Sequence, residues 1–279
     1  MRKIRTKIIV FILIILLFGA TLFLNRVRLR SLYDGWTRPT LPEAQKFQDA
    51  SFKLQDEERE STSVQDDSVS RQLPITNYQL PTEYNLDVPF QSQAPTLNWD
   101  MPYQEACEEA SLIMADAFFN GRGLTVEGMD TSIKKLVDWQ MKRFGYYEDT
   151  TPAEVVIIAQ EYFNLKATLD YDVSVDNIKK YISQNKLILA PAAGKILPNP
   201  NFKNGGPLYH MLIIRGYTQD KFITNDPGTK RGEEFVYKYN DLLNAIHAWP
   251  RASGGSKRDV TEAEMLTGEK VMVVTFSSQ

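Results

Sequence analysis

The chain is poor in the residues that build disulfides and metal centres. Its 279 residues include one cysteine, Cys107, and two histidines, His210 and His247. A lone cysteine forms no intrachain disulfide, and these three residues do not have the spacing of a zinc site. We therefore expect no metal, and the question becomes whether the cysteine is a reactive thiol.

The sequence has no internal repeat, and its folded part has no basic stretch. The formal net charge is −3, and the basic excess is confined to the first 40 residues, so the rest of the chain is net acidic. An acidic chain without a basic, aromatic-rich stripe argues against a nucleic-acid partner. With 43% hydrophobic and 24% charged residues, the composition is that of a globular protein with a substantial core.

One long hydrophobic run is present, at residues 8–24, and basic residues flank it on both sides. Its length is near the lower limit for a helix that spans a bilayer. A cleaved signal peptide is the alternative, but no A-x-A-like site ends the run and arginines follow at once. We expect an uncleaved, single-pass transmembrane anchor. The slightly larger positive charge before the run favours a cytoplasmic N-terminus and an extracytoplasmic body.

Composition divides the chain into three parts. Residues 1–30 form the anchor with its basic flanks, and residues 31–81 form a polar, acidic linker, most clearly between positions 55 and 70. Such a segment buries too little apolar surface to offset the entropy cost of ordering it. Residues 82–279 have the pattern of a folded domain.

Helical patterns dominate the first half of this domain and strand patterns the second. Thr151 and Pro152 mark the clearest helix start, with threonine as the N-cap and proline at the first helical position. The expected helices span residues 107–120, 130–143, 152–163 and 174–184, and the expected strands span residues 187–190, 210–217, 221–224, 234–237 and 270–276. Helices followed by strands predict an α+β fold with an antiparallel sheet.

Cys107 lies where an extended, proline-marked stretch changes to a helical pattern. Free N–H groups and the positive end of the helix dipole in a first turn stabilise a thiolate. A thiol nucleophile also needs a proton acceptor, and His210, at the start of an expected strand, is the candidate base. Taken alone, a cysteine on an apolar helix is more often a small core residue.

The expected hairpin after His210 supplies a carboxylate. With a three-residue loop at 218–220, Asp226 would pair opposite Leu212 and lie diagonal to His210 on the same face of the sheet. A loop of even length would place the two on opposite faces. An aspartate there would fix the imidazole tautomer and stabilise the imidazolium, although an Asn-Asp-Pro-Gly segment alone is an ordinary turn signal.

A tetrahedral intermediate also needs a hydrogen-bond donor for its oxyanion. A glutamine amide, together with the backbone N–H of the nucleophile, is one solution. Gln91, Gln93 and Gln104 all precede the cysteine, and Gln104 could instead cap the helix. The Asn- and Gly-containing loop from residue 197 to residue 208 comes just before His210, and we expect it to rim the cleft as a flap.

Four segments resemble the bacteriocin-processing (double-glycine) cysteine peptidases and their broader relatives in the papain-like clan. They are V-P-F-Q-S-Q, C-E-E-A-S-L-I-M, H-M-L-I-I-R-G-Y and F-I-T-N-D-P-G, and the resemblance covers roughly residues 84–276. It implies a papain-like fold with a helical lobe and a sheet lobe flanking the cleft, a peptide or protein substrate, and no cofactor. It also implies that Cys107 is the nucleophile, His210 the base, Asp226 the orienting carboxylate and Gln93 the oxyanion donor.

The chain departs from that family next to the cysteine. The family commonly has glycine there, whereas this chain has Glu108 followed by Glu109, and the gap from Gln93 to Cys107 is longer than in transporter-linked members. The two acids oppose thiolate formation by charge repulsion.

The leading interpretation is a membrane-anchored thiol hydrolase that cleaves a peptide or isopeptide bond through a Cys-His-Asp acyl-enzyme. Two alternatives stay open. One is an acyl transferase, similar to a transglutaminase, on the same scaffold. The other is an inactive peptidase-like binding module at the cell surface, which the two glutamates motivate.

Overall fold

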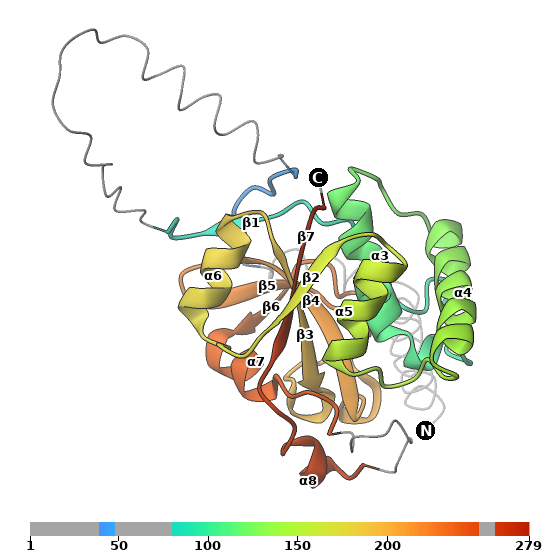
Figure 1. The fold of residues 1–279 in the computed structure, drawn as a ribbon. Coiled ribbons are helices and arrows are strands. Elements are labelled where there is room, and N and C mark those ends of the chain that lie inside the picture. The colour runs from blue at the N-terminus through green and yellow to red at the C-terminus, as the bar shows by residue number, and fades with distance from the viewer. Residues whose placement is uncertain (1–38, 48–79, 251–259, 279) are drawn as a thin grey trace, which may run out of the picture. The chain divides into compact units, whose positions relative to one another are not determined.

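Seven antiparallel strands form one sheet at the centre of the molecule (Figure 1). The computed structural model describes residues 39–47, 80–250 and 260–278. The sheet order is β2-β7-β3-β4-β5-β6, and β1 pairs with β4 beside this path. The strands are β1 (Tyr84–Asn85), β2 (Lys166–Asp170), β3 (Leu187–Ala193), β4 (Tyr209–Tyr217), β5 (Lys221–Asn225), β6 (Phe235–Lys238) and β7 (Met272–Phe276).

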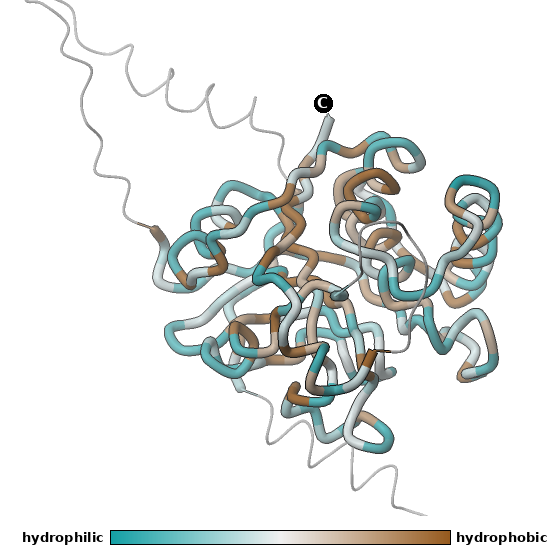
Figure 2. Tube along the Cα trace, turned by 60° about the horizontal axis from the view of Figure 1, so that its bottom comes forward, coloured by the Kyte–Doolittle hydropathy of each residue, from teal (hydrophilic) through white to brown (hydrophobic). Residues whose placement is uncertain are grey.

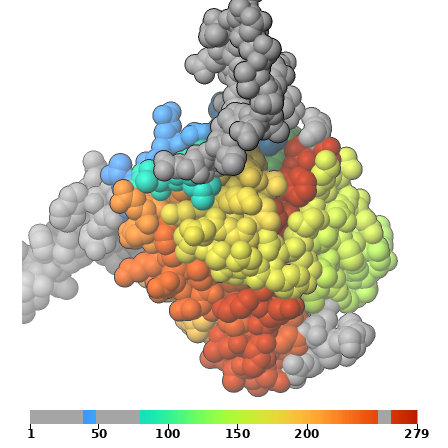
Figure 3. All heavy atoms as spheres, turned by 60° about the vertical axis from the view of Figure 1, so that its left-hand side comes forward, coloured from blue at the N-terminus to red at the C-terminus, as the bar shows by residue number. Residues whose placement is uncertain are grey.

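Helices cover both faces of this sheet. They are α3 (Cys107–Phe119), α4 (Val126–Arg143), α5 (Pro152–Glu161), α6 (Val175–Ser183), α7 (Tyr239–Ala245) and α8 (Glu262–Met265). In Figure 1, α3, α4 and α5 lie on one side of the sheet, and α6 and α7 lie on the other. Figure 3 shows α6 (yellow) on the surface of the second side. The predicted α+β class with an antiparallel sheet is confirmed.

Local sequence signals fix where several helices begin. The predicted start of α5 is confirmed, because Thr151 accepts a hydrogen bond from the backbone of Glu154 and the Glu154 side chain reaches back to the backbone of Thr151. Ser174 is the N-cap of α6, as predicted, and its side chain accepts a hydrogen bond from the backbone of Asn177. The helix predicted from residue 107 begins at Cys107. By contrast, β2 was not predicted, because this short edge strand is defined by its pairing with β7, which lies far along the chain.

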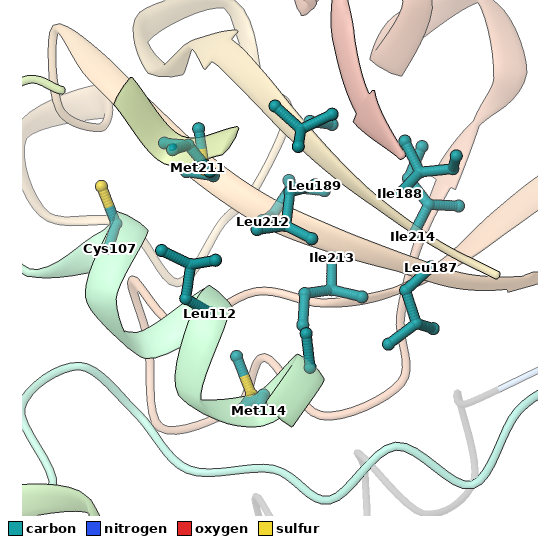
Figure 4. Close-up of a cluster of buried hydrophobic side chains, with 14 of the residues drawn as sticks. Cys107, Leu112, Met114, Leu187, Ile188, Leu189, Met211, Leu212, Ile213 and Ile214 are labelled. Atoms are coloured by element: carbon teal, nitrogen blue, oxygen red, sulfur yellow. The ribbon is translucent and has the colours of Figure 1, made fainter. Parts of the chain in front are cut away.

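The core lies between α3 and the central strands. Leu112 and Met114 on α3 are fully buried, and Leu112 points toward Leu212 of β4 (Figure 4). Each such side chain contributes about 1.5–3 kcal/mol of burial free energy. Figure 2 shows the hydrophobic segments concentrated along the strands in the middle of the domain, with hydrophilic segments in the outer turns. The helix that begins with Cys107 is therefore held rigidly on the sheet.

Part of the predicted linker packs on this domain. Gln45 forms a parallel bridge with Leu86, and the ring of Phe47 contacts the rings of Phe118 and Phe119 edge-on. Residues 48–79 lie outside the described residues, so the division into anchor, linker and domain stays a prediction. The hydrophobic run at 8–24 also lies outside them. In the parts of the chain that the structure does describe, no helix combines the length and the hydrophobicity that a membrane crossing requires.

The hairpin of β4 and β5 differs from the predicted three-residue loop. Tyr217 pairs with Phe222, so an even number of residues connects the strands, and the pairing begins in the parity that would separate His210 from Asp226. The register then shifts between Ile214 and Gly216, after which Ile214 pairs with Thr224. The β-bulge at Arg215 corrects this parity. Its extra residue returns the side chains of His210 and Asp226 to the same face of the sheet.

Arg215, the bulged residue, is buried and binds the segments that converge at this point. Its Nε donates to Asn85 Oδ1 at 3.2 Å, and its Nη1 donates to Val88 O at 3.1 Å and to Asn225 Oδ1 at 3.2 Å. A guanidinium satisfies several acceptors at fixed angles, which no other side chain does as well. The bulge is therefore tied both to the entry strand and to the residue before Asp226.

We expect replacement of Arg215 by methionine to destabilise the domain by about 3 kcal/mol or more, because three buried acceptors each lose a hydrogen bond from a charged donor, worth about 1.5–3 kcal/mol, and Asn85 Oδ1 is left without a donor. Urea unfolding followed by circular dichroism measures this loss. Arg122→Met is the matched control. That arginine pairs with Asp116 at the surface, and the change should cost about 1 kcal/mol at most. Equal effects of the two substitutions would contradict the role given to the bulge.

Candidate active site

His210 and Asp226 form a buried pair at the end of the β4–β5 hairpin. The imidazole Nε2 lies 2.8 Å from Asp226 Oδ1, and the side chains are 1% and 0% exposed. The backbone N–H of Gly228 donates to the same carboxylate oxygen at 3.0 Å. The predicted contact between the histidine and the aspartate is confirmed, whereas their catalytic roles stay predictions.

Two further donors hold the second oxygen of this carboxylate. Asn199 Nδ2 donates to Asp226 Oδ2 at 3.0 Å, and the Tyr237 hydroxyl donates to it at 2.7 Å. Burial would raise the pKa of Asp226, but the facing His210 and the hydrogen bonds from His210, Tyr237 and Asn199 hold that pKa below its usual value. The carboxylate therefore stays ionised inside the protein.

The pairing decides which ring nitrogen of His210 is left for chemistry. An ionised carboxylate only accepts hydrogen bonds, so Nε2 carries a hydrogen and donates it to Asp226. In the neutral ring Nδ1 is then unprotonated, and it is the atom that can take a proton from a thiol. This contact is compatible with the orienting role that the sequence analysis expected of Asp226, and that role stays a prediction.

The imidazole is also fixed by packing. The ring of Phe202 contacts it edge-on, with 5.4 Å between the ring centroids and an interplanar angle of 83°. A Cβ atom at position 228 would come to 2.9 Å from His210 Cε1 and 3.0 Å from Phe202 Cε1, so glycine is the residue that fits there. The loop from residue 197 to residue 208 therefore lies against the site, as expected. Its action as a flap stays a prediction.

Cys107 is the first residue of α3 and lies beside β4. Figure 4 shows its sulfur near Met211, the residue after His210, and the backbone of Met211 hydrogen-bonds to the sulfur and lowers its pKa. The thiol itself is directed elsewhere, because it donates to Glu108 Oε2 at 2.9 Å. The fold thus brings the cysteine to the strand that carries the histidine, with the proton of the thiol held by a carboxylate.

The two glutamates after the cysteine are buried, and each has a specific partner. Glu108 Oε1 accepts hydrogen bonds from Thr150, from its backbone N–H at 2.9 Å and from its hydroxyl at 3.3 Å. Glu109 accepts from the Gln140 side chain. Burial raises the pKa of Glu109 to about 7, with the Gln140 hydrogen bond acting against this rise. Burial and the charge of Glu109 also raise the pKa of Glu108 well above its usual range.

These surroundings disfavour a thiolate at Cys107. Burial raises the pKa of the thiol well above its ordinary value, and the charge of Glu108, its hydrogen bond and the charge of Glu109 raise it further. The helix N-terminus that the sequence analysis emphasised is present, but the acids in its first turn oppose it. The structure is that of a neutral, resting thiol.

Gln93 lies between the two halves of the site. Its Nε2 donates to the backbone carbonyls of Tyr103 at 2.9 Å and Gln104 at 3.1 Å, just before the cysteine. Its backbone N–H donates to Pro227 O at 3.0 Å, just after the aspartate. To donate to an oxyanion, the Gln93 side-chain amide would have to break its hydrogen bond to one of these two carbonyls.

The other two glutamines bond elsewhere. Gln91 donates to Leu124 O, and Gln104 donates to its neighbour Glu105. Of the three, Gln93 alone is hydrogen-bonded both to the turn before the cysteine and to the turn after Asp226.

Sequence reasoning missed Asn199, Tyr237 and Thr150. Asn199 lies in a loop that reads as a generic turn, Tyr237 occupies an ordinary strand pattern, and Thr150 precedes a helix cap. No spacing connects these residues to Asp226 or Glu108. The one available signal was the position of the Asn199 loop just before the histidine strand.

We expect Glu108→Gln to lower the pKa of the Cys107 thiol, because the substitution removes the charge and the anionic acceptor that now raise it. The rate of alkylation by iodoacetamide, measured from pH 6 to 10, should show its inflection at a lower pH than in the wild type. Because the chain has one cysteine, all labelling reports this site. Glu105→Gln, at a half-buried position in the turn before the cysteine, is the control. An unchanged inflection in the Glu108 variant would contradict the assignment.

Comparisons with known proteins identify the family of the chain. A family model described as the peptidase C39-like family matches residues 85–257. A crystal structure from Bacillus anthracis, assigned as a C39-like peptidase, is similar to the chain with a TM-score of 0.44 and 15% sequence identity, and the match covers 69% of this chain and 96% of that chain. No curated protein matches the sequence. Because the family model covers more than half of the chain, the protein belongs to the peptidase C39-like family, whose members are of the cysteine-peptidase type.

Proposed function

We propose that the protein is a papain-like cysteine peptidase that cleaves a peptide or isopeptide bond through an acyl-enzyme on Cys107. The observation that carries this proposal is the buried His210–Asp226 pair on the strand whose next residue, Met211, contacts the cysteine sulfur. Nucleophile, base and orienting carboxylate in this order are the parts that thiol acyl transfer needs. The family to which the chain belongs supports the reaction class.

The chemistry follows from the tautomer that Asp226 selects. His210 Nδ1 takes the thiol proton, and the thiolate attacks the carbonyl carbon to form a tetrahedral intermediate. The imidazolium then protonates the leaving amine, the C–N bond breaks and the acyl group remains on sulfur. A water molecule, deprotonated by His210, hydrolyses this thioester and restores the thiol.

The resting thiol must first turn away from Glu108. Its S–H···O hydrogen bond to that carboxylate competes with proton transfer to His210. We infer that substrate binding displaces the thiol from Glu108, since in the resting arrangement both burial and the neighbouring acids keep the sulfur neutral. The backbone N–H of Cys107 and the side chain of Gln93 are the proposed donors to the oxyanion.

We expect Cys107→Ala to abolish peptide cleavage by the full-length protein, because no other thiol is present. A proteome-derived peptide library, analysed by mass spectrometry for new termini, measures cleavage without a known substrate. His210→Ala and Asp226→Asn should each lower the rate at least about a hundredfold, by loss of the base or of its tautomer. His247→Gln is the matched histidine control and should leave cleavage unchanged.

Cleavage that survives in the Cys107→Ala variant would exclude the mechanism. The same experiment with an added amine separates hydrolysis from acyl transfer, since a transferase would yield the amide of that amine instead of the free acid. Hydrolysis is the simpler proposal, because it needs no acceptor other than water.

The second candidate function is a binding module on an inactive scaffold. The specific observation in its favour is the buried Cys107 thiol, which is hydrogen-bonded to Glu108. The pKa of the thiol and the pKa of Glu108 are both raised. A wild-type protein that is neither alkylated below pH 9 nor able to cleave any library peptide would favour this function.

We also propose that residues 8–24 anchor the protein in a membrane as a single span, with the peptidase domain on the extracytoplasmic side. The support is the hydrophobic run and the larger positive charge before it. The protein should resist extraction from membranes by alkaline carbonate, and protease added to intact cells should degrade the domain. Release by carbonate would contradict the anchor, and protection of the domain would contradict the orientation.

A further inference from the structure

We propose that Asn199 is a positioning residue for the reaction, which fixes the Asp226 carboxylate and couples it to the loop from residue 197 to residue 208. The inference rests on the proposed function, because it concerns the residues that orient His210. The observation behind it is that every hydrogen-bonding group of one buried side-chain amide is used, half of them toward the carboxylate and half toward the loop.

The amide nitrogen of Asn199 serves the carboxylate. It donates to Asp226 Oδ2 at 3.0 Å and to the Tyr237 hydroxyl oxygen at 3.1 Å, while that hydroxyl donates in turn to the same Oδ2 at 2.7 Å. The three groups therefore form a closed triangle. Both hydrogens of the amide are engaged, and both donors to Oδ2 are held in place by each other.

The amide oxygen of Asn199 serves the loop. It accepts from the backbone N–H of Asn201 at 3.0 Å and from the Asn201 side chain at 3.2 Å. The opposite amide orientation would turn this oxygen toward the carboxylate and lose both sets of bonds. The network thus admits one orientation, and the side chain is 6% exposed, so water does not substitute for it.

The same loop also reaches the histidine. Phe202 contacts the imidazole edge-on. Phe202 is held there by a close approach of backbones, because a Cβ at Gly206 would lie 2.6 Å from Gly194 O and 2.9 Å from the Phe202 ring. One short segment therefore contacts both members of the His210–Asp226 pair, so any movement of the loop changes the orientation of the base.

Two functions of Asn199 are separable by substitution. If it only orders the loop, Asn199→Asp should behave as the wild type, because an aspartate oxygen still accepts from Asn201. If it positions Asp226, the aspartate variant loses the donor and places a second carboxylate against the first. We expect kcat for a library-selected peptide to fall about tenfold to a hundredfold in Asn199→Ala, as for other outer-shell partners, and further in Asn199→Asp. KM should change less than kcat.

A second measurement does not depend on turnover. The chain has two histidines, so selective ¹⁵N-histidine labelling of the full-length protein gives two sets of ring signals, and His247→Gln assigns them. In the wild type His210 should show the Nε2–H tautomer. In Asn199→Ala and Asn199→Asp this preference should change, while His247, bonded to Gly268 O, serves as an internal reference. Asn201→Ala, which leaves the bond to Asp226 intact, is the control variant.

Wild-type His210 signals in both Asn199 variants would overturn the inference, as would a normal kcat in Asn199→Asp. Equal changes in Asn201→Ala would also overturn it, because they would show that loop order alone matters. Failure of the proposed function has a different outcome: the Asp226→Asn variant would then retain the full activity of the wild type. If Asn199→Asp does not fold, which circular dichroism reveals, Asn199→Ala and the ¹⁵N signals decide the question.

Discussion

The hydrogen bond between His210 and Asp226 is the interaction on which the rest of the site depends. It lies in the interior, where an unpaired carboxylate would be strongly disfavoured, and it forms only because the hairpin that carries both residues has the correct register. That register is produced by the bulge at Arg215, not by the turn. Four donors then hold the carboxylate, one from the histidine, one from the backbone of Gly228, and one each from Asn199 and Tyr237. The sheet thus fixes the charge, the tautomer and the position of the base together.

Cys107, the proposed nucleophile, is under an opposing influence. Glu108 and Glu109 suit the positive end of α3, and favourable interaction with the dipole is a stabilising feature of a first helical turn. The same acids raise the pKa of the Cys107 thiol, which burial raises first. A helix start that is good for stability is therefore poor for thiolate formation, and the resting site keeps its proton on sulfur. In the proposed mechanism, the base is therefore preformed, whereas the thiol needs a conformational change.

Much of the fold was accessible from the sequence, because its signals are local. The capping residues of α5 and α6 and the apolar pattern after Cys107 depend on neighbours within a few positions, and the structure confirms all three helices. The hairpin shows where local reasoning ends. The predicted pairing of His210 and Asp226 is right, yet the predicted three-residue loop is wrong. An even connection and a bulge together give the same parity, and the bulge depends on a buried arginine bound to segments more than a hundred residues away.

The sequence by itself determined the class of the fold, most of its helices and central strands, and which side chains have the chemistry of a thiol peptidase, since these follow from periodicity, capping and residue type. Only the tertiary structure decided which side chains are hydrogen-bond partners in the site. It set Asn199 and Tyr237 against one carboxylate oxygen, and it placed Thr150 on Glu108 and the thiol on that same glutamate. Hydrogen bonds between residues distant in the chain require the packing of the whole domain to bring them within 3 Å. Burial, which sets the strength and the pKa consequences of those bonds, is a property of the folded molecule.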